Sequence, residues 1–152
     1  MAVTASFSLT VTGCVAVFRL FGDISIFVFP VFAASERMDN LWKTTCFEIF
    51  WQPIGQPGYV EFNLSPSGRW ASYDFDSFRE GMRDAPVEAI SIACSHSSAR
   101  GGGELVLKAS IAANLPAPAH PAGGGIQLWA LAFPPGPPEF HSEACRQWIV
   151  ER

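Results

Sequence analysis

Hydrophobic and polar residues alternate with a period of two along much of this 152-residue chain. The pattern is clearest at residues 59–65, where Val60, Phe62 and Leu64 alternate with polar or aromatic residues. Because successive side chains of a β-strand point to opposite faces of the sheet, this alternation predicts a strand with one buried face. The segment 41–82 holds three such runs, and most of the polar and aromatic chemistry lies with them.

Short strand-like runs recur along the rest of the chain, separated by Pro, Gly and polar residues. We expect a helical turn at 76–82, because Ser77 and Glu80 have the spacing of a capping box and Gly81 can end it. Polar loops are expected at 33–40 and 95–103. The expected strands span residues 5–12, 14–21, 24–29, 44–51, 59–65, 69–75, 87–94, 104–111, 126–133 and 147–151. This order predicts an all-β, antiparallel β-sandwich with a single domain over 1–152.

Composition narrows the partners that we expect. The formal net charge is −4, and the chain has no basic stripe, so we expect no nucleic-acid partner. The most apolar run, 24–34, is too short to cross a bilayer and contains Pro30, so we expect no membrane partner. The N-terminus has no positive charge before its apolar residues and does not resemble a secretory signal. These features predict a soluble cytoplasmic protein.

The four cysteines lie far apart in the sequence, without a CxxC pair or a neighbouring histidine. This spacing is poor for zinc. Two disulfides are arithmetically possible, but we expect buried free thiols. The cysteines are Cys14, Cys46, Cys94 and Cys145.

The hairpin at 59–75 predicts a polar and aromatic face. If Leu64 pairs with Arg69 across the turn, Asn63 lies opposite Trp70, and Glu61 lies opposite Ser72. The core side would hold Phe62, Leu64, Ala71, Tyr73 and Phe75. The candidate ligand-binding residues are then Glu48, Glu61, Asn63, Trp70, Ser72 and Asp74. A one-residue bulge at Gly68 would instead turn Trp70 into the core.

Such a face suits a sugar. An aromatic ring stacks on the apolar face of a pyranose, while carboxylates and amides form hydrogen bonds with its hydroxyls. The alternative is an ordinary solvated sheet face with one exposed tryptophan. Glu48 and Glu61 could also form an acid pair for glycoside hydrolysis, although carboxylates on one binding face are commoner than catalytic pairs. The sequence shows no nucleophile–base pair, since nothing local supports a Cys46–His141 dyad, so we expect no catalytic residue.

Three segments carry a family resemblance, and together they extend it over the chain from about residue 15. LWKTTCFEIFW at 41–51, YVEFNLSPSGRWASYDF with FREGM at 59–82, and WALAFPPGPPEFH at 129–141 resemble the bacterial DOMON-like domain proteins. That group is described as similar to family 9 carbohydrate-binding modules. The resemblance implies a DOMON-like β-sandwich from a superfamily of sugar-binding and haem-binding domains. Haem as a cofactor is therefore an alternative, with His141 and Met82 or Met38 as candidate ligands.

The chain departs from this family in two places. Relatives carry an additional strand before the segment that matches 128–131, where this chain has the Pro/Ala/Gly stretch 114–125. We therefore expect one strand fewer and an exposed sheet edge that could pair two copies into a homodimer. The family's paired histidine is here His141-Ser142.

Together these observations predict a non-catalytic domain that binds carbohydrate or another small polar ligand. The alternatives are a haem or redox module and a structural domain without a small ligand.

Overall fold

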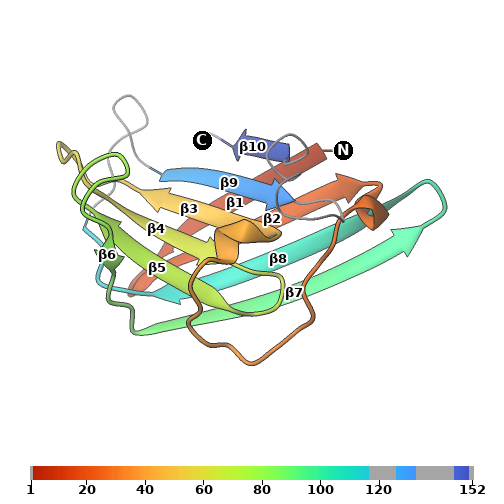
Figure 1. The fold of residues 1–152 in the computed structure, drawn as a ribbon, viewed down its shortest axis with the longest axis horizontal. Helices are drawn as coiled ribbons and strands as arrows, with labels where there is room; N and C mark the ends of the chain where they lie inside the picture. The colour runs from red at the N-terminus through yellow and green to blue at the C-terminus, as the bar shows by residue number, and fades with distance from the viewer. Residues whose placement is uncertain (1, 117–125, 133–145, 151–152) are drawn as a thin grey trace.

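A computed structural model of the chain describes residues 2–116, 126–132 and 146–150 (Figure 1). The strands form two antiparallel sheets, which confirms the predicted all-β sandwich. One sheet has the order β1-β2-β8-β7, with β1 at Ala2–Thr10, β2 at Gly13–Gly22, β8 at Gly102–Ala112 and β7 at Ala89–Ala99. The other has the order β10-β9-β3-β4-β5-β6, with β10 at Arg146–Val150, β9 at Ile126–Ala132, β3 at Cys46–Trp51, β4 at Tyr59–Leu64, β5 at Trp70–Phe75 and β6 at Arg83–Asp84.

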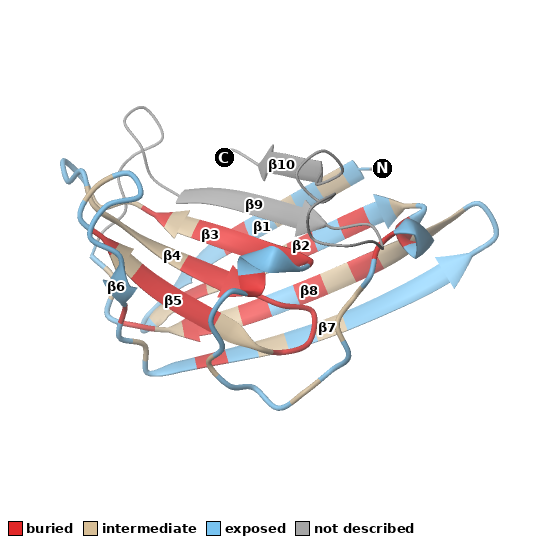
Figure 2. Cartoon of the chain, viewed as in Figure 1, coloured by how far each residue is buried: buried red, intermediate tan, exposed pale blue. Residues whose placement is uncertain are grey.

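The main core lies between the two sheets and is built from alternate residues of their strands. Phe18 of β2 and Phe47 of β3 meet there with ring centroids 5.0 Å apart. Figure 2 shows buried residues along β3, β4 and β5, whereas β7 is largely exposed. Burial of apolar surface is the dominant favourable term in folding, at roughly 25 cal/mol per Å². Alternation therefore identified the core side of β3 and β4, because apolar residues recur at the buried positions of these strands.

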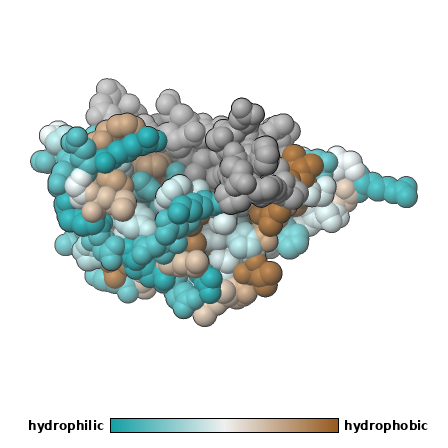
Figure 3. All heavy atoms as spheres, in the orientation of Figure 1, coloured by the Kyte–Doolittle hydropathy of each residue, from teal (hydrophilic) through white to brown (hydrophobic). Residues whose placement is uncertain are grey.

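The predicted strand at 24–29 is wrong. Ile24–Ile26 forms a short 3₁₀ helix, η1, which Asp23 caps by accepting a hydrogen bond from the Ser25 N–H at 3.3 Å. The position beside β2 that a third strand would need belongs to β8, which pairs with β2 from Gly13 to Gly22. The chain instead crosses towards the other sheet at residues 27–34, and apolar atoms gather in that part of the face in Figure 3. Exposed apolar side chains of this crossing are Val28, Val31 and Phe32.

The predicted helical turn at 76–82 is also wrong. Residues 77–80 form a tight turn, in which the Glu80 N–H donates to the Ser77 carbonyl at 3.1 Å and the Asp76 N–H donates to the Glu80 carbonyl at 3.0 Å. Arg79 has a left-handed backbone with φ of 60°, which ends any right-handed helix. Ser77 and Glu80 do interact, but through a side-chain hydrogen bond of 2.6 Å across the turn.

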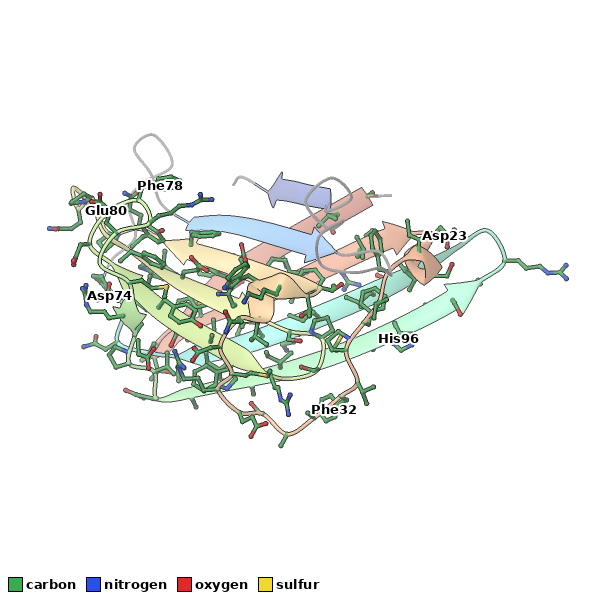
Figure 4. All side chains as sticks on the ribbon, viewed as in Figure 1. Asp23, Phe32, Asp74, Phe78, Glu80 and His96 are labelled. Atoms are coloured by element: carbon green, nitrogen blue, oxygen red, sulfur yellow. The ribbon has the colours of Figure 1, made fainter. Side chains whose placement is uncertain are left out.

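The polar loop predicted at 95–103 is replaced by a long hairpin. β7 continues to Ala99 and β8 begins at Gly102, so only Arg100 and Gly101 connect them. Gly101 has φ of 90°, which a glycine adopts without the steric cost that Cβ would bring. His96 therefore lies on an exposed strand and not in a loop, as Figure 4 shows.

Two further expectations concern the cysteines and the stretch before β9. Cys14, Cys46 and Cys94 are free thiols; Cys14 and Cys46 are buried as predicted, whereas Cys94 is only half-buried, and Cys145 lies outside the described residues. Most of the Pro/Ala/Gly stretch, 117–125, also lies outside them, so the predicted missing strand stays a prediction. No helix in the described part of the chain is long and apolar enough to cross a membrane.

Candidate functional site

The pairing of β4 with β5 decides which side chains share a face. Leu64 pairs with Trp70, so the predicted pairing of Leu64 with Arg69 is wrong by one residue. The connecting turn holds one residue more than that prediction allowed, because the Ser65 N–H donates to the Arg69 carbonyl at 2.9 Å. Gly68, with φ of 92°, closes the turn by donating to the Ser65 carbonyl at 3.0 Å. A shift of one residue moves every side chain of β5 to the opposite face.

Three of the six predicted site residues consequently leave the candidate face. Trp70 is half-buried and packs against the main core, as the bulge alternative expected. Ser72 is fully buried, and its hydroxyl donates to the Ala85 carbonyl at 2.8 Å. Asp74 forms an ion pair with Arg83 at 2.6 Å. These three side chains therefore have structural contacts and do not meet Glu61 or Asn63.

The outward side chains of β3, β4 and β5 form rows across the sheet. Paired residues share a face, and the register gives the rows Glu48–Asn63–Ala71, Phe50–Glu61–Tyr73 and Tyr59–Phe75. The Tyr59 and Phe75 rings stack with centroids 4.6 Å apart, and Phe50 packs against Tyr59 at 5.9 Å. Glu61 thus lies in the middle of a largely aromatic surface. Glu48 was predicted on this face, whereas Tyr73 and Phe75 were predicted on the main-core side. Both are buried, but in a second hydrophobic cluster with Leu41, Cys46 and Ala71.

These rows, apart from the fully buried Asn63 and Ala71, form the floor of a groove with a volume of about 1190 Å³. One wall follows residues 39–42 and includes η2, a 3₁₀ helix at Leu41–Lys43 that lies across the outer face of β3 and β4 (Figure 1). The turn after β5 lies at another side, and Figure 4 shows its Phe78 at that end of the molecule. The lining residues used below are Asp39, Trp42, Glu48, Phe50, Tyr59, Glu61, Tyr73, Phe75, Arg79, Arg83 and Asp84.

Glu48 is the most deeply buried carboxylate of the groove, with 5% of its surface exposed. No side chain among the described residues donates a hydrogen bond to it. Burial raises the pKa of Glu48 to about 8, and the nearby charge of Glu61 adds to the effect. Near neutral pH this carboxyl group is therefore largely protonated in the free protein.

Glu61 is only half-buried and is held from below by Asn63. The Asn63 side-chain amide donates to the Glu61 carboxylate at 2.8 Å. Burial raises the pKa of Glu61, while the Asn63 hydrogen bond and the charge of Arg79 oppose the rise. Asn63 itself is fully buried and does not line the groove. Of the six predicted site residues, two reach the groove and Asn63 positions one of them.

The wall beside Tyr73 is fixed by a network around Arg37. The Tyr73 hydroxyl donates to the Asp39 carboxylate at 2.7 Å, and Arg37 donates to the same oxygen at 2.8 Å. Arg37 also forms an ion pair with Asp84 and lies over the Tyr73 ring, 5.4 Å from its centroid. Burial, followed by the Asp39 contact, raises the pKa of Tyr73 to about 12. One arginine therefore pairs with both carboxylates of this wall and offsets one of their two negative charges.

Arg79 of the turn after β5 and Arg83 of β6 are engaged differently. Arg83 pairs with Asp74 at 2.6 Å and with Asp76 at 2.7 Å. Arg79 lies beside the ring of Phe78, 5.1 Å from its centroid, and forms no ion pair among the described residues. Neither arginine pairs with Glu48 or Glu61 in the described part of the chain, so the groove floor keeps two acidic groups without a salt-bridge partner.

Trp42 is the tryptophan of the groove that the residue pattern missed. It is 48% exposed, at the rim, and belongs to η2, which follows an irregular segment with no alternation. The sequence feature that could have indicated a place near the groove is its position in LWKTTCFEIFW, directly before β3. A further tryptophan, Trp129 of β9, is the register partner of Glu48.

The described residues give little support to the alternatives of metal binding, haem binding or thiol catalysis. These residues contain no group of three His, Cys, Asp or Glu side chains that could hold a metal ion. Met82 lines the groove, but His141, the other proposed haem ligand, lies outside the described residues. Cys46 is fully buried, and burial raises its pKa well above the usual value, so its thiolate is strongly disfavoured.

Comparison with known proteins identifies no relative. No protein-family model, curated protein or solved structure matches this chain.

Proposed function

We propose that this protein is a non-catalytic binding domain whose groove holds a saccharide. The observation that carries the proposal is the central placement of Glu61 among the rings of Phe50, Tyr73, Tyr59 and Phe75. Sugars have apolar C–H faces and polar edges, so a binding site needs ring surfaces and hydrogen-bonding groups side by side. The floor of the groove offers this combination on three neighbouring strands.

The roles of the residues follow from their contacts. Glu61 is held by Asn63, so it presents a positioned acceptor to sugar hydroxyls. Trp42 at the rim offers a large ring with half of its surface exposed, which a pyranose would cover. The Arg37 network keeps Tyr73 and Asp39 in place and so reduces the ordering cost of binding.

The resemblance to DOMON-like and family 9 carbohydrate-binding proteins supports the same class of ligand. Its first two segments contain the groove residues of β3, β4 and β5 and also Trp42. We therefore propose that the sandwich is DOMON-like and that its outer sheet face has the binding role. Hydrolysis by Glu48 and Glu61 is the competing activity, and it is tested by looking for shortened products.

Calorimetric titration with β-1,4-linked glucose, glucosamine and N-acetylglucosamine tetramers tests the proposal. We expect binding of at least one tetramer, release of no shorter products, and at least about tenfold weaker binding by Trp42→Ala. Phe32→Ala is the matched control, because Phe32 is an exposed aromatic residue that does not line the groove. No binding of any tetramer at millimolar concentration, or equal losses in both variants, would contradict a saccharide site here.

A further inference from the structure

The charges of the groove are unevenly compensated. Arg37 pairs with both Asp39 and Asp84, and Arg83 is shared between Asp74 and Asp76, so each arginine offsets one of two negative charges. Only Arg79 at the exposed turn remains to offset Glu48 and Glu61, and it forms no ion pair with either of them among the described residues. A ligand that reaches the floor therefore meets two carboxyl groups that have no cationic partner in the described part of the chain.

Glu48 is the informative member of this pair. Glu48 has only 5% of its residue surface exposed, lines the groove, and receives no hydrogen bond from any described side chain. Burying a carboxyl group without a partner costs free energy, and a bound cation would remove that cost. Glu48 has no hydrogen-bond or ion-pair partner among the described residues, and a ligand group could supply one.

The surroundings of the two carboxyl groups also favour a cation. Phe50 and Tyr73 are the register partners of Glu61 on either side, and Tyr59 stacks on Phe75 in the next row. Aromatic faces attract ammonium groups through their quadrupoles, and the attraction grows where water is excluded. Carboxyl groups between aromatic rings are the combination that holds an ammonium ion.

We propose that the ligand carries an ammonium group, which lies against Glu48 and Glu61 between the aromatic rings of the floor. That the ligand is a saccharide rests on the proposed function. Combined with that function, the inference gives a saccharide with free amino groups as the ligand class. A neutral saccharide would leave Glu48 protonated and Glu61 without a counter-charge, and would bind more weakly.

The matched ligands are the glucosamine tetramer and its N-acetylated counterpart, which share a backbone and differ in the charge at each nitrogen. We expect the glucosamine tetramer to bind at least about tenfold tighter at pH 7. Glu48→Gln should reduce that preference to below about threefold, because the amide keeps the shape but not the charge. Glu104→Gln, on the other sheet and paired with Arg19, is the control and should keep the full preference.

A permanently charged probe separates the ionisation of protein groups from the ionisation of the ligand's amino groups. Choline keeps its charge at all pH values, and 3,3-dimethylbutan-1-ol is its uncharged isostere. Choline affinity should rise roughly tenfold per pH unit from pH 6 to pH 7 and level off above pH 8, because binding favours ionised Glu48. The titratable or charged described residues that line the groove with Glu48 are Asp39, Tyr59, Glu61, Tyr73, Arg79, Arg83 and Asp84, and the charge of Glu48 also acts on buried Cys46. The uncharged isostere should bind weakly and without this pH dependence.

The outcomes distinguish the two proposals. Because the ligand comparisons use the wild-type protein, they do not depend on whether a variant folds. Equal binding of the charged and acetylated tetramers overturns the ammonium inference and leaves the saccharide function standing. Binding of choline with its pH dependence, but of none of the tetramers, overturns the saccharide function and supports the ammonium site. Binding of neither choline nor any tetramer overturns both proposals.

Discussion

Leu64 of β4 pairs with Trp70 of β5, and this single register sorts the side chains of the hairpin between core and groove. Trp70 turns to the core side, while Tyr73 becomes the partner of Glu61 on the groove floor. Pairing Leu64 with Arg69 instead would have exchanged the two faces of β5. The turn between the strands is therefore the local feature on which the candidate site depends.

Gly68 in this turn should resist substitution. Its φ of 92° is unfavourable for any residue with Cβ, and an added Cβ would lie 3.1 Å from the Ala33 carbonyl oxygen. We expect Gly68→Ala to lower the free energy of unfolding by about 2 kcal/mol in urea denaturation. Gly101→Ala is the matched control, because Gly101 has a similar φ of 90° but an added Cβ there would meet nothing within 4 Å. Equal losses in both variants would show that the contact with Ala33 is immaterial.

Ser72 should matter for stability and not for binding. Its buried hydroxyl donates to the Ala85 carbonyl and lies on the face opposite the groove. We expect Ser72→Ala to lower the free energy of unfolding by about 1 kcal/mol, since it leaves a buried acceptor without its partner. Saccharide affinity, measured by calorimetry on the folded variant, should stay within about twofold of the wild type. A selective loss of affinity with unchanged stability would return Ser72 to the binding face.

Glu48 should make the protein less stable as the pH rises. Its pKa is raised to about 8 in the folded state, so between about pH 4.5 and pH 8 the unfolded chain has released a proton that the folded protein keeps. Each pH unit inside this window should therefore cost up to about 1.4 kcal/mol from this group. Urea denaturation at pH 5, 6, 7 and 8 measures the slope.

Glu48→Gln should flatten that slope, whereas Glu104→Gln should leave it unchanged. Glu61, whose pKa is also raised, contributes a slope of the same sign that stays in both variants. Parallel slopes in the wild type and Glu48→Gln would contradict the burial of an ionisable Glu48.

The described thiols should be unreactive in the folded protein. Burial raises the pKa of Cys14 to about 12 and that of Cys94 to about 11, and Cys46 is fully buried. In a Cys145→Ser variant we expect an aromatic disulfide reagent at pH 8 to label these three thiols only slowly, and to label all of them after denaturation. Rapid labelling of Cys46 in the native state would show that the groove floor opens readily.

The alternation of polar and apolar residues was sufficient to predict the sandwich and the two faces of β3 and β4. Phe47 and Phe62 lie in the core and Glu48 and Glu61 face the groove, as the pattern predicted, because burial acts on each strand separately. The pairing between strands is a different matter. It depends on the backbone of a turn, here the φ of Gly68, and several turn conformations are compatible with the same residues.

The other differences have similar local causes. The run at 24–29 is apolar enough for a strand, but β8 occupies the place beside β2 that it would need. At 76–82, the left-handed Arg79 overrides a capping-box spacing. Trp42 could not be placed in the groove from the sequence, since it lies on a short 3₁₀ helix whose position depends on tertiary contacts.

The most direct test of the binding groove follows the tryptophan indole N–H signals in nuclear magnetic resonance spectra during titration with the glucosamine tetramer. The signals are assigned by replacing each tryptophan in turn with phenylalanine. We expect the Trp42 signal to shift, because its ring lines the groove, and the Trp51 and Trp70 signals to stay, because both side chains pack in or against the core. A shift of the Trp70 signal without one of Trp42, or no shift of any indole signal at saturating ligand, would contradict a binding groove on this face.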